Sequence, residues 1–256
     1  MPSIAVIGGS GLAHNLLEVE KEVKVHTPFG SPSDLVMLGK ISGIEVAFLP
    51  RHGRSHSIQP GRINFRANIW ALKELGVSRI LSCSAVGSLQ DNVKPGDFVF
   101  PDQFIDLTKV RPSTFYEGSR ICHVSVADPF CPELRSSLFQ KSQKPFHREG
   151  TYICIEGPRF STRAESRLFR SWGCSVIGMT LVPECILARE AEICYSPISM
   201  VTDYDTFKGN AVSIDEVLKT MKGNEQRIKS LLADVIPAIS EERKCPCKSA
   251  LKEALL

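Results

Sequence analysis

The sequence predicts an α/β protein organised as a single domain. Short β-rich runs alternate with helical patterns along the whole chain, which is typical of a sheet flanked by helices. The last apolar run, 193–202, is long enough for an interior strand. After residue 236 the sequence becomes polar and rich in lysine, so we expect a domain over 1–236 and a polar C-terminal extension over 237–256.

The expected strands are short runs that are rich in β-branched and apolar residues. They span 3–8, 45–50, 79–86, 97–101, 151–156, 175–179 and 193–202. A helix is expected over 64–75, where apolar residues recur at helical spacing and Gly76 follows as a C-terminal cap. Further helix starts are predicted by the capping-box pairs Thr162 with Glu165 and Ser213 with Glu216, and by Pro183.

Composition excludes several classes of function. Hydrophobic residues make up 43% of the chain and charged residues 23%, as in ordinary globular proteins. The net charge of +3 is too small to indicate nucleic-acid binding. No apolar run approaches the ~20 residues of a membrane span, and no import or secretion leader precedes the first strand. We therefore expect a cytoplasmic protein with no membrane or nucleic-acid partner.

Nine cysteines are unusual in such a protein. Most of them lie in strand-like segments and are expected to be buried thiols. Cys245 and Cys247 differ, because they lie in the polar extension, where core packing is a poor explanation. A zinc site needs about four ligands, and no second close-spaced pair accompanies them, so no metal is expected. Disulfides remain the other hypothesis, and they would indicate a hyperthermophilic source.

Oxygen and nitrogen donors follow several of the predicted strands. Ser10 lies in a glycine-rich loop after the first strand, Arg51 and His52 follow the second, and Ser84 lies on the third. Thr180 precedes the helix start at Pro183, where free backbone N–H groups favour anions. Each signal alone fits a tight turn or a surface ion pair, but ligands of open α/β sheets gather at the carboxyl ends of strands. The combination indicates an anion site.

Five sequence blocks resemble those of the 5′-methylthioadenosine phosphorylases, within the wider purine nucleoside phosphorylase group. They read IGGSGL (7–12), PRHGR (50–54), NIWALK (68–73), IEGPRFS (155–161) and VTDYD (201–205). The likeness runs in order from about residue 3 to about 235. It implies a mixed, twisted and partly barrel-like sheet flanked by helices, assembled as a homotrimer or a dimer of trimers. It also implies inorganic phosphate as co-substrate and no cofactor.

The resemblance assigns roles to residues that match the family's motifs. Phosphate would be bound by Ser10, Arg51, His52, Ser84, Ala85 and Thr180. Met179 would lie against the ribose, and Phe160 and Ser161 beside the base. His123 would reach a neighbouring subunit's 5′ pocket, where a plain loop histidine is the alternative. Ile214 and Val217 would face a methylthio group, although their spacing fits core packing equally well.

Asp203 and Asp205 are the predicted adenine-recognition residues. A departing purine must gain a proton at N7, and a buried carboxyl group with a raised pKa can supply it, which assigns Asp203 as general acid. An ionised carboxylate only accepts hydrogen bonds, so Asp205 would accept from a 6-amino group and repel a 6-oxo group. A turn or a metal ligand is the alternative for this Asp-Tyr-Asp segment, but no further carboxylates cluster nearby.

The predicted reaction is phosphorolysis of 5′-methylthioadenosine to adenine and 5-methylthioribose 1-phosphate. Three features depart from the animal enzymes: Gly178 replaces an asparagine, Ser10 and Ser84 replace threonines, and the loop after Asp205 is slightly shorter. Because the 6-oxopurine branch also has glycine at that position, a broader phosphorylase that accepts adenosine or inosine is the alternative. A hydrolase that uses water and a non-enzymatic binding module are more distant alternatives.

Overall fold

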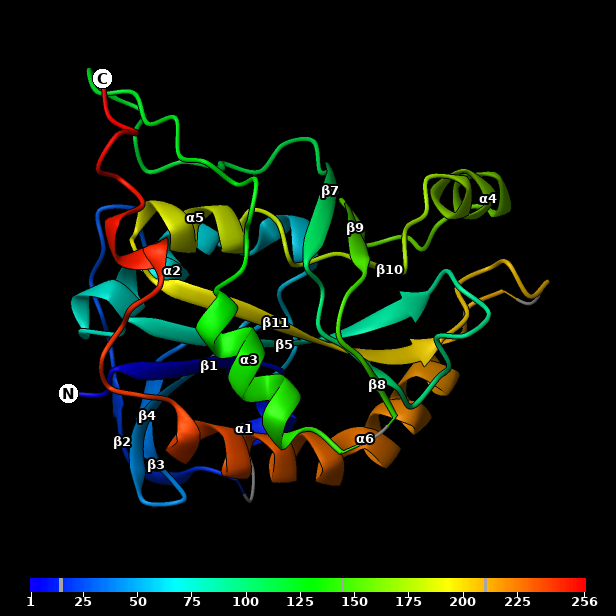
Figure 1. Cartoon of the computed structure of the whole chain (residues 1–256), viewed down its shortest axis with the longest axis horizontal. Coiled ribbons are helices and arrows are strands. Elements are labelled where there is room, and N and C mark those ends of the chain that lie inside the picture. The colour runs from blue at the N-terminus through cyan, green and yellow to red at the C-terminus, as the bar shows by residue number, and fades with distance from the viewer. Residues whose placement is uncertain (14–15, 144, 210) are drawn as a thin grey trace.

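The computed structural model describes residues 1–13, 16–143, 145–209 and 211–256. Within them, a mixed sheet of eleven strands runs through the molecule (Figure 1). The strands are β1 (Ile4–Gly8), β2 (Glu18–Val23), β3 (Val36–Ile41), β4 (Ile44–Pro50), β5 (Arg79–Ser88), β6 (Phe98–Val99), β7 (Gln103–Leu107), β8 (Phe146–His147), β9 (Thr151–Ile155), β10 (Val176–Gly178) and β11 (Cys194–Asp203). This architecture confirms the predicted single-domain α/β class.

The sheet branches at its central strand, β5. Parallel partners β1 and β11 flank the first part of β5, whereas β10 pairs antiparallel with its last residues, Gly87 and Ser88. From β10 the sheet continues through β9 to β7. A second branch leaves β11 through β6 to β8. The two branches curve the sheet into the partly closed form that the resemblance implies.

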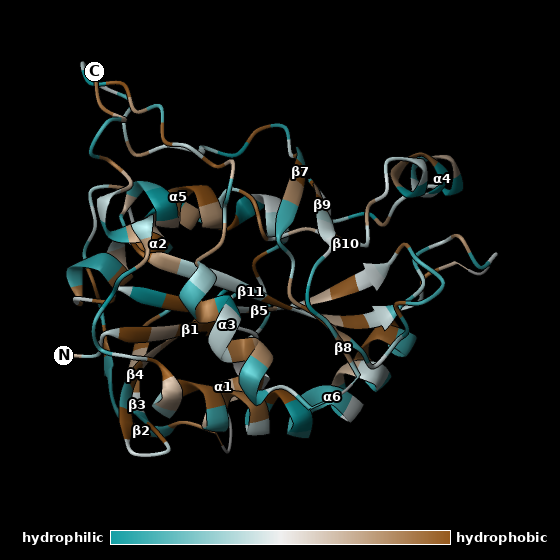
Figure 2. Ribbon diagram, viewed as in Figure 1, coloured by the Kyte–Doolittle hydropathy of each residue, from teal (hydrophilic) through white to brown (hydrophobic). Residues whose placement is uncertain are grey.

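Helices cover both faces of the sheet, as the alternating residues of β1 require. Ala5 and Ile7 pack into one core with helices α2 (Phe65–Glu74) and α5 (Glu184–Glu190). Ile4 and Val6 pack into a second core with α6 (Ile214–Val235) and α3 (Pro132–Lys141). Figure 2 shows β1 as mostly hydrophobic along its length. Both faces are therefore buried, as a central parallel strand requires.

The remaining helices are shorter or lie at the periphery. They are α1 (Ser10–Ala13), α4 (Arg163–Ser171) and the 3₁₀ turns η1 (Pro60–Arg62), η2 (Ile236–Ala238) and η3 (Pro246–Ser249). Thr162 and Glu165 form the predicted capping box at the start of α4, and the Ser213 side chain caps α6. No helix among the described residues is long and apolar enough to cross a bilayer.

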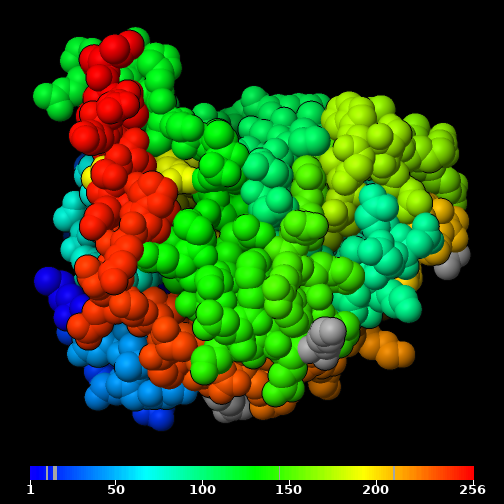
Figure 3. Space-filling view, in the orientation of Figure 1, coloured from blue at the N-terminus to red at the C-terminus, as the bar shows by residue number. Residues whose placement is uncertain are grey.

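The C-terminal segment, residues 237–256, runs over the surface along one side of the molecule and forms the C-terminal strap (Figure 3). Its two cysteines do not share this exposure, because Cys245 and Cys247 are 4% and 2% exposed and pack into the second core. The expectation that they lie in a solvated tail is therefore wrong. The boundary after residue 236 stays a prediction.

Candidate active site

The predicted base-binding residues lie where β5 and β11 end, beside α4 and the start of α6 (Figure 1). The register between β5 and β11 shifts between Val201 and Asp203, so that Asp203 pairs with Gly87. A Cβ atom at Gly87 would lie 2.9 Å from Asp203 Oδ1. Because Gly87 has no side chain, the Asp203 carboxyl group can occupy the space beside it.

The Asp203 carboxyl group is buried and hydrogen-bonded on both oxygens. Oδ2 accepts from Thr202 Oγ1 at 2.8 Å, and Oδ1 accepts from the backbone N–H of Asp205 at 2.8 Å. Burial raises the pKa of Asp203, and the neighbouring charge of Asp205 adds to the rise, while the two hydrogen bonds oppose it. The group thus holds a proton to higher pH than an exposed aspartic acid does.

Asp205 lies in a left-handed backbone conformation, with φ of 47°, that turns it back toward Ser161. Ser161 Oγ donates to Asp205 Oδ1 at 2.5 Å. Asp205 Oδ2 is buried and has no hydrogen-bond partner in the described part of the chain. An unpaired buried acceptor costs about 1–3 kcal/mol, and a ligand with an N–H group would satisfy it.

The middle of β5 contains the predicted phosphate residues Ser84 and Ala85. Most of this ten-residue strand is buried, but Ser84 is half-buried and Ala85 is exposed. The side chains packed on this central strand therefore leave it accessible at Ser84 and Ala85. Thr180 lies after β10 and is 7% exposed. The side chain of Ser10 lies outside the described residues.

Arg51 is held by a buried acidic partner, Glu184, which the sequence analysis did not identify. The Arg51 Nε and Nη2 groups donate to the two carboxylate oxygens of Glu184 at 2.7 and 2.9 Å. Nη2 also donates to Ser82 Oγ, and Nη1 donates to the Cys83 carbonyl oxygen. These bonds use four of the five N–H groups of the arginine and leave one Nη1–H without a partner among the described residues. Glu184 lies 133 residues away in sequence, so no local pattern predicts this pair.

His52 is neutral near pH 7. Its Nδ1 lies 2.8 Å from the Ile58 carbonyl oxygen, and because a carbonyl only accepts, Nδ1 carries the ring proton. Burial, together with the positive charge of Arg51, lowers the pKa of His52 to about 4. Nε2 is therefore a hydrogen-bond acceptor.

The loop after β9 brings the predicted ribose and base residues together. Gly157 lies so close to Met179 that a Cβ atom there would be 2.5 Å from the Met179 sulfur. Arg111 links the same two segments: it donates to the Glu156 carboxylate at 3.0 Å and to the Met179 carbonyl oxygen at 2.7 Å. Phe160, at the tip of the loop, is 40% exposed. The sequence analysis also missed Arg111 as a positioning residue.

The residues predicted for the 5′ side are mostly exposed. Ile214 is 65% exposed and Val217 is half-buried, so core packing is the wrong interpretation for Ile214. His123 lies in an exposed loop whose backbone N–H donates to the Ala254 carbonyl oxygen of the C-terminal strap. This loop and the C-terminus project together from the far end of the molecule (Figure 1).

The arrangement can be compared with known proteins. Residues 3–237 match the Phosphorylase superfamily. The chain belongs to this superfamily. It is 58% identical to an S-methyl-5′-thioadenosine phosphorylase of Thermofilum pendens, over 99% of this chain and 98% of that protein. It is 56% identical to the corresponding protein of Pyrococcus furiosus, with 98% of each chain covered.

Two solved superfamily members share the fold over nearly their whole length. A methylthioadenosine phosphorylase from an Antarctic soil metagenome superposes with a TM-score of 0.94 at 45% identity, covering 100% of this chain and 92% of the other. A mutant adenosine/methylthioadenosine phosphorylase from Schistosoma mansoni, in complex with methylthioadenosine, gives 0.92 at 37% identity, with coverage of 98% and 96%.

Gly178 has a structural cause that the sequence does not reveal. The Tyr152 side chain is fully buried beside Gly178, and a Cβ atom at residue 178 would overlap the Tyr152 hydroxyl oxygen. The space that an asparagine side chain would enter is therefore filled by Tyr152. In this chain, glycine at residue 178 and tyrosine at residue 152 therefore fit together.

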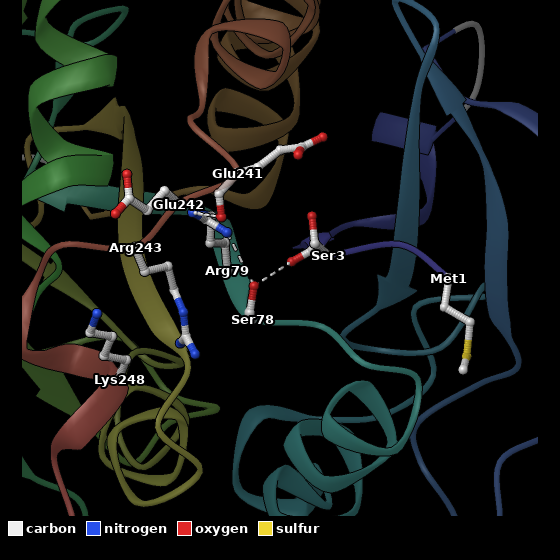
Figure 4. Close-up of a pocket in the computed structure, with 8 residues that line it drawn as sticks. All are labelled: Met1, Ser3, Ser78, Arg79, Glu241, Glu242, Arg243 and Lys248. Atoms are coloured by element: carbon white, nitrogen blue, oxygen red, sulfur yellow. Dashed lines mark hydrogen bonds between the residues drawn. The ribbon is translucent and has the colours of Figure 1, made fainter.

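A cavity of about 580 Å³ lies elsewhere, at the opposite ends of the same strands. It is lined by Met1, Ser3, Ser78, Arg79, Glu241, Glu242, Arg243 and Lys248 (Figure 4). Arg79 crosses it and donates to the Glu241 carbonyl oxygen at 2.9 Å. Ser3 and Arg79 mark the amino ends of the strands, where α/β sheets do not bind their ligands. We therefore do not assign it as the active site.

Proposed function

We propose that this chain catalyses the phosphate-dependent cleavage of 5′-methylthioadenosine to adenine and 5-methylthioribose 1-phosphate. The observation that carries the proposal is the pair of buried carboxyl groups at the end of β11. Asp203 has a raised pKa, and Asp205 has an unpaired acceptor oxygen. One holds a proton for N7 of the base, and the other accepts from the 6-amino group.

Breaking the N-glycosidic bond leaves positive charge on the sugar and negative charge on the purine. Asp203 transfers its proton to N7 as the bond breaks, so the base leaves neutral. Phosphate attacks the anomeric carbon from the opposite face of the sugar. Ser84, the remaining Arg51 N–H and the backbone near Thr180 supply donors that hold it in line, so part of the rate enhancement is positioning.

His52 distinguishes between the protonation states of phosphate. Because its Nε2 accepts a hydrogen bond, it pairs with the P–OH group of hydrogen phosphate rather than with a bare oxygen. This orients the remaining oxygens toward the N–H and O–H donors. The proposed co-substrate is therefore HPO₄²⁻.

The deciding experiment measures adenine released from 5′-methylthioadenosine with and without phosphate. We expect release to require phosphate and a phosphorylated sugar to form in equal amount. Equal rates in phosphate-free buffer would instead identify a hydrolase. Binding without turnover would identify a binding module.

Substrate breadth is the second candidate property. Because Tyr152 fills the space beside Gly178, no side chain at residue 178 can read the base, and adenosine or inosine becomes a candidate substrate. The relative kcat/KM values for methylthioadenosine, adenosine and inosine separate the two possibilities. We expect methylthioadenosine and adenosine to exceed inosine, since Asp205 repels a 6-oxo group.

We further propose that the enzyme works as a homotrimer. Ile214 and Leu218 are 65% and 61% exposed, and both lie near the start of α6. A neighbouring subunit that contributes His123 would cover these apolar side chains and close the pocket. The proposal also accounts for the exposed loop around His123, which projects beside the C-terminus, away from the end of β11 (Figure 1).

A further inference from the structure

Four buried cysteines gather at one point, far apart in the sequence. Cys131 precedes the first residue of α3, Cys194 is the first residue of β11, and Cys245 and Cys247 lie in the C-terminal strap. Their sulfur atoms all lie within 4.8 Å of one another. Their exposed fractions are 1%, 0%, 4% and 2%.

The spacing of the sulfur atoms matches a tetrahedral thiolate site. A zinc–sulfur bond of about 2.3 Å places the corners of the tetrahedron about 3.8 Å apart. Cys194 Sγ and Cys245 Sγ lie 3.3 Å apart, whereas a disulfide needs about 2.05 Å. All nine cysteines are free thiols in the structure. The cluster is thus close to metal-binding geometry and away from bonded sulfur pairs.

Donors surround the cluster and can stabilise the charge of four thiolates. Arg189 Nη1 donates to Cys247 Sγ at 3.8 Å, and the backbone N–H of Leu134 is directed at the Cys131 sulfur. Cys131 also occupies the N-cap position of a ten-residue helix. Helix N-termini favour negative charge. Zinc with four thiolates carries a net charge of −2, and these groups offset it.

Simple packing explains isolated cysteines better than it explains this cluster. Cys174, for example, is fully buried among apolar side chains of the third core cluster. Cys245 and Cys247, separated by one proline, instead direct both sulfurs to the same point. The sequence analysis found no zinc pattern because Cys131 and Cys194 each come singly from distant elements.

We propose that Cys131, Cys194, Cys245 and Cys247 bind one structural zinc ion. As the four sulfur–zinc bonds form, each thiol releases its proton to solvent and the ion loses its bound water, so no oxidant or reductant is required. The site joins the C-terminal strap and the start of α3 to the first residue of β11. The last residue of that strand is Asp203, so the zinc fixes the far end of the catalytic strand.

The test uses the full chain, purified with a thiol reductant and without chelator. We expect about one zinc per chain by elemental analysis, as a closed four-thiolate site requires. Replacement of zinc by cobalt should give the visible absorption of a tetrahedral tetrathiolate complex. The variant Cys247→Ala should lose the ion, whereas Cys174→Ala, equally buried but outside the cluster, should keep it.

The wild-type protein alone can overturn the proposal, whether or not the variants fold. Disulfides are the competing prediction: if protein purified without reductant shows only five of the nine thiols after unfolding, and no metal is present, the cluster is two disulfides. If all nine titrate and neither zinc nor cobalt binds, the cluster is packing only. Either result rejects the zinc site.

Discussion

At the scale of single residues, Asp203 shows how catalysis and stability oppose each other. Its folded pKa is raised by burial, above the ordinary value of about 3.9 in an unfolded chain. A group whose pKa is raised in the folded state stabilises the fold at pH below its unfolded-state pKa. This contribution is lost as pH rises through its folded-state pKa. Burial thus makes the charged form of Asp203 costly to the fold, and the same shift keeps a proton available for the base to higher pH.

The first prediction concerns Asp203→Asn. Turnover of methylthioadenosine should fall at least about tenfold, because an amide cannot transfer a proton to N7. The fold should tolerate the amide, since Thr202 Oγ1 also donates to the Val86 carbonyl oxygen and can then accept from the new N–H. Steady-state kinetics and urea unfolding at pH 7 measure both effects, and the free energy of unfolding should not decrease.

The control and the pH profile sharpen this test. Asp97→Asn, buried to a similar degree but paired with His147, should retain turnover. In the wild type, kcat should fall as pH rises through the raised pKa of Asp203, and this fall should be absent from Asp203→Asn. Unchanged turnover in Asp203→Asn would remove the general-acid role.

The second prediction concerns base choice by Asp205. In Asp205→Asn, the amide N–H can donate to a 6-oxo group, so kcat/KM for inosine relative to adenosine should rise at least about tenfold. Both substrates are measured with the same variant, so any general loss of activity cancels in the ratio of the two kcat/KM values. Ser161→Ala is the matched variant: it removes the hydrogen bond to Asp205 Oδ1 but leaves the carboxylate, so adenosine should stay preferred.

At the scale of elements, α5 delivers Glu184 to Arg51, and the third prediction concerns this pair. Glu184→Gln should lower the free energy of unfolding by about 3 kcal/mol, because it leaves the buried guanidinium without its counter-charge. KM for phosphate should also rise as Arg51 loses its orientation. Glu190→Gln is the control, since Glu190 is buried on the same helix and accepts from the Phe115 N–H without a cation partner.

The outcome separates a positioning role from a merely structural one. If stability falls in Glu184→Gln while KM for phosphate stays at the wild-type value, Arg51 does not bind phosphate. Urea unfolding and initial rates at varied phosphate concentration give the two quantities independently.

The fourth prediction concerns the contact between the β9 loop and Met179. Arg111→Lys keeps the charge but loses the planar fork that reaches Glu156 and the carbonyl oxygens of Met179 and Val182. KM for the nucleoside should rise more than KM for phosphate, and limited proteolysis should become faster within 156–161. Equal changes in both constants would mean that Arg111 serves the fold as a whole.

Elements with strong local signals were predictable from sequence, and those that depend on distant partners were not. The seven predicted strands and four predicted helices are present, because apolar runs and capping side chains act within a few residues. Strands β2, β3, β7 and β8 and helix α3 were missed. In β2 the reason is plain, since Glu18–Val23 is charged and mostly exposed at the sheet edge. Glu184 and the cysteine cluster were missed because their partners come from other elements, and sequence spacing carries no signal for such contacts.

At the scale of the whole molecule, the residues predicted for the 5′ side are mostly exposed in one chain, and the fifth prediction concerns the neighbouring subunit proposed to cover them. If His123 serves a neighbouring subunit, mixed assemblies of His123→Ala and Asp203→Asn should contain sites with both functional residues. Random assortment predicts about a quarter of wild-type activity from two variants that are each impaired. Co-expression followed by assays below the KM of methylthioadenosine measures this recovery.

The mass of the particle supplies the control for the mixing experiment. Light scattering should give three chains of 28.3 kDa each for the wild type and for both variants. A monomer with full activity would reject the shared site. A trimer without recovered activity would show that His123 serves its own chain or none.

The contact between Tyr152 and Gly178 constrains any redesign of the site. Because a Cβ atom at residue 178 would overlap the tyrosine hydroxyl, a side chain fits there only if Tyr152 moves or is replaced by a smaller residue. Tyr152 is fully buried, so a smaller residue at 152 alone would leave a void in the core. A redesign that introduces an asparagine at residue 178 therefore has to change both positions together.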